Sequence, residues 1–98
     1  MKGLADLDAA DFLACVGQEV DLRTEDGSVR ATVRSVDVLG PGWERSEAFS
    51  VLFAGPEDTP LAQGTFGLGH PSLPEVEILL VPVGRDQEGG LLYEAIFN

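Results

Sequence analysis

Hydrophobic and polar residues alternate along most of this chain, and glycine or proline interrupts the alternation at intervals. Alternation of this kind puts the apolar side chains of a β-strand on one face, and Gly and Pro are typical of the turns between strands. The pattern predicts six strands, over residues 19–24, 28–39, 47–54, 64–69, 75–83 and 91–97. Because short links favour pairing between consecutive strands, we expect a mainly β, antiparallel meander that curls into a small, partly open barrel.

The N-terminal segment has helical spacing instead. Residues 7–16 are predicted to form one short helix, with Asp8 as its N-cap, because a carboxylate there accepts hydrogen bonds from the free N–H groups of the first turn. Phe12, Leu13 and Val16 share one helical face, so we expect them to be buried together. The helix is expected to cover one end or edge of the curled sheet.

Two strands contain irregular positions. The apolar phase changes between Val33 and Val36, which predicts a β-bulge or a sharp bend at residues 34–35. Pro82 lacks a backbone N–H, so it requires either the edge of a sheet or a bulge. Bends of this kind help a small sheet to curl towards a barrel.

Other strands differ in how their two faces are composed. Residues 49–54 and 79–83 are apolar on both faces, which is typical of strands that are covered on both sides. In the short strand 64–69, Gly67 and Gly69 leave one face bare, which indicates the close approach of another backbone. This strand is also a candidate edge strand, able to add to the sheet of a neighbouring molecule.

Composition and charge narrow the classes of function. The 98 residues, 44% of them hydrophobic and 23% charged, fit one globular domain. The net charge of −11 disfavours direct binding to nucleic acid or to anionic membranes, because both require a basic surface. It is compatible with a basic protein partner, with mimicry of nucleic acid, and with a simply soluble surface. No apolar stretch is long enough for a signal peptide or a membrane helix, so a cytoplasmic location is expected.

The sequence contains no cluster of reactive side chains. Cys15, the only cysteine, is interpreted as a buried small hydrophobe, and His70, the only histidine, as a turn residue or hydrogen-bonding plug. One His and one Cys make a zinc site implausible. Glu94 is expected to form an ion pair with Arg30 or Arg34 if its face of the last strand is covered. We therefore expect no enzymatic activity, cofactor or metal, with a carboxylate-dependent hydrolase as a remote alternative.

Trp43 is the best candidate for a binding residue. It lies in a loop flanked by Gly and Pro, together with Glu44, Arg45 and Glu47. Tryptophan and arginine are frequent anchors of protein interfaces, so these four residues form the predicted partner-binding site. The alternative is that Trp43 folds back as a lid on the core.

Several sequence blocks, in order along nearly the whole chain, resemble a small bacterial family of unknown function. The blocks are residues 49–56 (FSVLFAGP), 61–66 (LAQGTF), 70–71 (HP), 80–83 (LVPV) and 93–98 (YEAIFN). The resemblance implies that the chain is encoded near phage-tail-collar-like proteins, and hence an accessory or assembly role in a tail-like particle. It supplies no catalytic residues, and Gly67 and Gly69 depart from the bulkier residues expected there.

The sequence leaves two functions open. The first is a non-enzymatic protein-interaction module whose partner is another protein, either tail-collar-like or basic, and which becomes part of a larger particle. The second is an acidic inhibitor or immunity-type protein that occupies the basic site of another protein by mimicking nucleic acid. Acidic residues gathered on one face favour the second function, and a uniform spread opposes it. The sequence does not define the oligomeric state.

Overall fold

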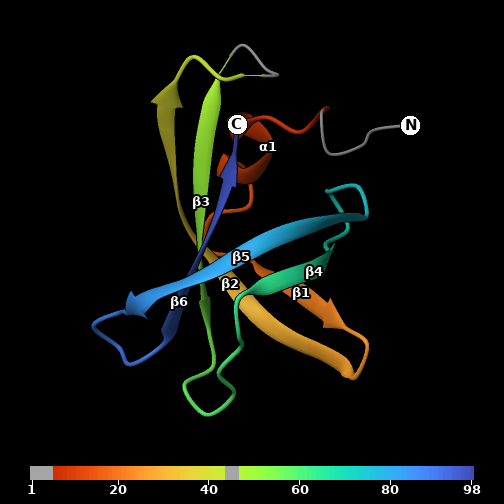
Figure 1. Ribbon diagram of the computed structural model, residues 1–98, viewed down its shortest axis with the longest axis vertical. Coiled ribbons are helices and arrows are strands. Elements are labelled where there is room, and N and C mark those ends of the chain that lie inside the picture. Colours follow the sequence, from red (N-terminus) through yellow and green to blue (C-terminus); the bar gives the residue numbers. More distant parts are fainter. Residues whose placement is uncertain (1–5, 44–46) are drawn as a thin grey trace.

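Six antiparallel strands close into a barrel, and one short helix covers an end of it (Figure 1). The computed structural model describes residues 6–43 and 47–98. Its elements, in chain order, are α1 (Ala9–Leu13), β1 (Glu19–Thr24), β2 (Gly27–Gly40), β3 (Ala48–Gly55), β4 (Gly64–Gly69), β5 (Val76–Arg85) and β6 (Leu91–Phe97). The mainly β fold predicted from the sequence is therefore confirmed. In the part of the chain described, no helix has the length and apolar character needed to cross a bilayer.

The strands follow the order β1-β2-β3-β6-β5-β4 around the barrel, and β4 pairs back to β1. Two meanders of three strands therefore lie side by side, where a single meander was expected. The link of residues 56–63 loops at the lower end of the molecule in Figure 1, and β3 pairs with β6 rather than with β4. Because closure gives β4 a partner on each side, its predicted position at a sheet edge is wrong.

One core fills the barrel, formed by inward side chains from all six strands. Phe12 extends this core into α1, because its ring centroid lies 5.2 Å from that of Phe97 and 6.0 Å from that of Phe49. Phe49 and Phe97, paired across β3 and β6, stack at 4.7 Å. These aromatic contacts hold α1 at the end of the barrel where β3 begins and β6 ends. At the other end of β6, the Tyr93 hydroxyl accepts a hydrogen bond from the Leu61 N–H at 2.8 Å.

The cap of α1 is as predicted, but its length and its buried face are not. Asp8 is the N-cap, and its carboxylate and that of Asp11 each accept a hydrogen bond from the backbone N–H of the other, at 3.1 and 3.0 Å. The helix already ends at Leu13, so the expected face does not continue. Leu13 and Val16 are 54% and 44% exposed, whereas Cys15 in the following turn is buried.

Both predicted irregularities are present in the strands. The register between β2 and β3 shifts between Val33 and Ser35, and the register between β5 and β6 shifts between Pro82 and Gly84. The first bulge keeps apolar side chains inward on both sides of the phase change. The second accommodates Pro82, which has no N–H to donate.

The bare glycine face of β4 is covered by a side chain rather than by another backbone. A Cβ atom on Gly69 would lie 2.6 Å from Nη2 of Arg23, and one on Gly67 would lie 3.5 Å from the Arg23 Cβ. Arg23 comes from the paired strand β1 and forms an ion pair with Glu75. The two glycines therefore provide the space in which the Arg23 side chain crosses the barrel surface.

Candidate protein-binding surface

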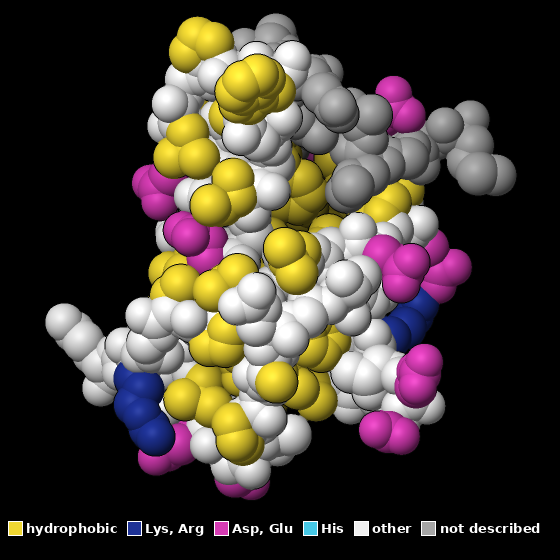
Figure 2. Space-filling view, in the orientation of Figure 1, with side chains coloured by type: hydrophobic (Ala, Val, Ile, Leu, Met, Phe, Trp, Pro, Cys, Tyr) yellow, Lys and Arg dark blue, Asp and Glu magenta, His cyan; other side chains and the backbone are white. Residues whose placement is uncertain are grey.

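The outer surface of β3, β5 and β6 carries many apolar side chains. The exposed members are Leu79, Val83 and Ile96, which are 56%, 50% and 59% exposed. We call the outward side chains of this region the apolar face: Leu52, Leu79, Val81, Val83, Leu92 and Ile96. Figure 2 shows hydrophobic side chains in a band along this side of the molecule, with acidic side chains at its margins.

The exposure of the apolar face corrects one expectation from the sequence. Inward positions of β5 such as Ile78 and Leu80 fill the core, so outward positions would be polar on an ordinary solvated barrel. The two-sided apolarity of residues 79–83 predicted a strand covered on both faces. In the described structure the outer side is open, and exposed apolar patches of this kind are typical of interaction sites.

Glu94 lies at the centre of the apolar face. Leu52 of β3 and Val81 of β5 are its direct partners in the two neighbouring strands. On β6 itself, Leu92 and Ile96 are the residues two positions away, which point to the same side. Glu94 is half-buried, so its carboxylate group is bordered on four sides by apolar side chains.

The predicted ion pair of Glu94 with Arg30 or Arg34 is wrong. Arg30 pairs with Asp21 at 3.5 Å, and Arg34 pairs with Asp86. Both arginines belong to β2, which β3 separates from β6 in the barrel. Within the described part of the chain, no hydrogen bond or ion pair of the Glu94 carboxylate is found.

Trp43 is exposed at the end of the β2–β3 hairpin. Its side chain is 89% exposed, so the alternative of a lid on the core is wrong. Val38 and Leu39, which lie near the C-terminal end of β2 just before this loop, are each 55% exposed. We call Val38, Leu39 and Trp43 the hairpin tip. Of the other predicted binding residues, Glu47 is exposed, and Glu44 and Arg45 lie outside the described residues.

The only cysteine and the only histidine lie together, which the sequence did not reveal. Sγ of Cys15 is 4.0 Å from Nδ1 of His70. The same Nδ1 accepts a hydrogen bond from the Ser72 N–H at 3.0 Å, so the proton of the neutral ring is on Nε2, which donates to Oε1 of Gln18 at 2.8 Å. Pairing of β1 with β4 brings these two segments together across 55 positions of sequence.

A thiol, an imidazole and an amide in this order are the parts of a cysteine nucleophile, but the environment opposes that chemistry. Cys15 is only 2% exposed, and burial, followed by the charge of Asp11, raises the pKa of its thiol. The thiol donates a hydrogen bond to the Asp11 carbonyl oxygen, which lies 3.4 Å from Sγ. A protonated, covered thiol is not a nucleophile. The contacts among Cys15, His70 and Gln18 instead link the turn after α1 to the loop after β4.

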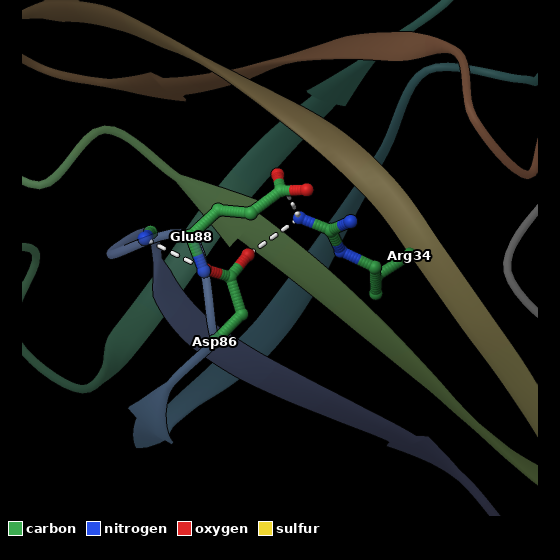
Figure 3. Close-up of polar contacts among 4 residues, drawn as sticks. Arg34, Asp86 and Glu88 are labelled. Atoms are coloured by element: carbon green, nitrogen blue, oxygen red, sulfur yellow. Dashed lines mark hydrogen bonds and ion pairs between the residues drawn. The ribbon is translucent and has the colours of Figure 1, made fainter.

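A polar cluster joins β2 to the turn between β5 and β6 (Figure 3). Arg34 donates to one carboxylate oxygen of Asp86 and lies 4.0 Å from the carboxylate of Glu88. The other oxygen of Asp86 accepts from the N–H groups of Glu88 and Gly90, at 2.9 and 2.8 Å. The Asp86 side chain is only 13% exposed and its oxygens are used within the turn, so the cluster fixes this turn against the barrel.

The hollow beside this cluster does not favour catalysis. It has a volume of about 370 Å³ and is lined by two arginines, Arg30 and Arg34, and by three acidic residues, so an anion would meet more negative than positive groups. Neither Glu94 nor His70 lines it or the two other hollows described, which lie beside β4 and at the β5–β6 turn. Among the described residues, no group of three or more His, Cys, Asp or Glu side chains is arranged to hold a metal.

Comparison with known proteins identifies a family but no characterised relative. A family model described as "Domain of unknown function (DUF6916)" matches residues 7–97. No curated protein and no solved structure matches the chain. The match spans all six strands and the helix.

Proposed function

The chain belongs to the DUF6916 family, a domain family of unknown function, so its role has to be inferred from the features of its own surface. We propose that it is a non-enzymatic protein-interaction module. The observation that carries this proposal is the apolar face, an open apolar surface on a small and otherwise strongly charged domain. The hairpin tip adds an exposed tryptophan at one end of the molecule.

Covering the apolar face would stabilise a complex appreciably. Each Leu, Ile or Val that is half-exposed contributes about 1 kcal/mol when a partner covers it. Leu79, Val83 and Ile96 together then contribute roughly 3 kcal/mol, and Trp43 adds to this because aromatic side chains are strong interface anchors. This contribution favours binding but is smaller than the cost of association, so the rest of the contact supplies the remainder.

A protein is a better partner than nucleic acid or a membrane. The four arginines in the described part of the chain, Arg23, Arg30, Arg34 and Arg85, are each in an ion pair with an acidic residue. With a net charge of −11, this leaves no basic surface for phosphate groups among the described residues. An apolar surface bordered by acidic groups fits a protein that is apolar or basic at its contact.

Pull-down from the organism that encodes the chain tests this proposal. We compare the tagged wild type with the double variant Leu79→Ser/Ile96→Ser and with the matched control Leu13→Ser/Val16→Ser, which changes exposed apolar residues near α1. We expect a defined set of proteins whose recovery falls about tenfold or more only in the first variant, as loss of about 1.4 kcal/mol would cause. Equal recovery with all three baits, or with none, contradicts the proposal.

The resemblance to a family encoded near phage-tail-collar-like proteins supports a narrower form of the proposal. In this form the chain is an accessory or assembly factor of a tail-like particle, made in the cytoplasm and then incorporated. The same pull-down addresses it, since a tail-collar-like protein would be among those lost with the apolar-face variant. Recovery of face-dependent partners unrelated to tails would leave the interaction module and exclude this form.

The acidic-inhibitor alternative rests on the net charge of −11. Mimicry of nucleic acid requires a continuous acidic surface. On the side shown in Figure 2 the acidic side chains are separated by the hydrophobic band, which favours the interaction module. A hydrolase is less well supported still, because neither Glu94 nor His70 lines any of the three hollows described.

A further inference from the structure

If the apolar face binds a protein, as the proposed function has it, Glu94 gives that contact a specific chemical requirement. Its carboxylate has apolar neighbours on four sides, and each arginine in the described part of the chain already pairs with another acidic residue. A partner that covers the apolar face also covers this carboxylate. Burial of an ionised carboxylate without a partner is strongly unfavourable, so the partner has to bring a cation.

The closed barrel limits the form of that partner. At the centre of the apolar face the strands are already paired on both sides: Leu52 pairs with Ser35 and Glu94, and Glu94 pairs with Leu52 and Val81. A peptide therefore has no free strand edge beside Glu94 to which it could add. An amphipathic helix satisfies its own backbone hydrogen bonds and presents an apolar stripe, so it suits a surface that offers only side chains.

A second copy of this chain is a poor occupant. In a two-fold symmetric contact centred on the apolar face, Glu94 of one molecule would lie near Glu94 of the other. Two carboxylates in such a site repel each other. The net charge of −11 adds repulsion between copies and favours encounter with a basic protein.

We infer that the apolar face binds an amphipathic helix of another protein whose apolar stripe has an arginine or lysine at its centre, paired with Glu94. The apolar side chains supply the contact area, and the Glu94 carboxylate selects the helix by its charge. A helix without the cation would leave Glu94 buried and unpaired, and one with an acidic residue there would be repelled.

Selection from a displayed peptide library tests this inference. The probe is a set of helical peptides with a varied apolar stripe and Arg, Lys, Gln, Leu or Glu at its central position. The baits are the wild type, Glu94→Gln, Glu94→Lys, and the control Glu25→Gln, which removes the same charge in the exposed β1–β2 turn. Circular dichroism spectra confirm that each bait is folded.

We expect the wild type and Glu25→Gln to enrich Arg or Lys over Glu at least tenfold, Glu94→Gln to lose this preference, and Glu94→Lys to prefer Glu. The same central residue selected by all four baits overturns the inference, as does the absence of any enriched peptide. The proposed function is decided separately by the pull-down, whose face-dependent partners would stand even if the helix selection fails.

Discussion

At the scale of single residues, the environment of a side chain is set by partners that are distant in sequence. Cys15 was expected to be buried, and it is. Its neighbour His70 lies 55 positions away, and local sequence contains no sign of the contact. The side chain of Arg23 in β1 likewise lies over Gly67 and Gly69 of β4, which are more than 40 positions away in sequence.

The Cys15 thiol should make the stability depend on alkaline pH. Burial, with the charge of Asp11 as the smaller cause, raises its pKa above the ordinary value of 9.0. The folded state then keeps the proton when the unfolded chain has lost it, so the free energy of unfolding falls as the pH rises past about 9. Cys15→Ser does not titrate there, and the stability difference between the two proteins should shrink from pH 7 to pH 10 in urea unfolding.

A stability difference that is the same at both pH values would contradict this account of Cys15. Other groups that titrate in the alkaline range are common to both proteins and cancel in the comparison. The labelling rate of the thiol gives a second measure, because a covered, protonated thiol reacts slowly until the protein unfolds.

At the scale of elements, β6 closes the barrel. It pairs with β3 on one side and with β5 on the other, and it contributes Tyr93, Ala95 and Phe97 to the core. The ring of Phe97 also packs against the ring of Phe12, which anchors α1 to the barrel. The last strand therefore joins the two meanders and holds the helix in place.

Removal of residues 93–98 should unfold the domain. The change deletes the aromatic rings of Tyr93 and Phe97, and loss of each buried aromatic costs about 3–5 kcal/mol. This is comparable with the whole stability of a small domain, roughly 5–15 kcal/mol. Circular dichroism should show no cooperative melting, whereas removal of the exposed Asn98 alone should change little. A shortened chain as heat-stable as the full one would show that β6 does not close the barrel.

At the scale of the whole molecule, charge and the apolar face act against each other. An apolar surface promotes association, and a net charge of −11 opposes contact between copies. Glu94 places one of these charges in the middle of the apolar face, where self-association would bury it. We therefore expect the protein to be a monomer in solution.

Glu94→Leu should convert this monomer to a self-associating form. The substitution removes the buried-charge penalty and joins the apolar residues on the two sides of position 94. Sedimentation velocity at increasing concentration should show dimers or larger species for this variant and none for Glu25→Leu, which makes the same change in the β1–β2 turn. Identical behaviour of the two variants would mean that Glu94 does not control association.

Much of the secondary structure follows from local pattern. Alternation and turn residues predicted β1, β4 and β6 at the bounds observed, and the phase change after Val33 and the missing N–H of Pro82 predicted two bulges. These features depend on the geometry of one strand and its turns, so neighbouring residues carry the information. The helix predicted over residues 7–16 is longer than the observed α1, Ala9–Leu13. Contacts with the barrel, and not helical spacing, decide where the helix ends.

Local patterning and composition are sufficient to predict the mainly β class, the inward set of apolar residues and the high negative charge. Long-range pairing sets three further features: β3 pairs with β6, the outer side of β5 is open, and Glu94 has apolar neighbours instead of Arg30 or Arg34. Alternation cannot predict these features, because it specifies the two faces of each strand but not which strands become neighbours. That choice depends on barrel closure, and closure leaves the apolar face on the outside of the barrel.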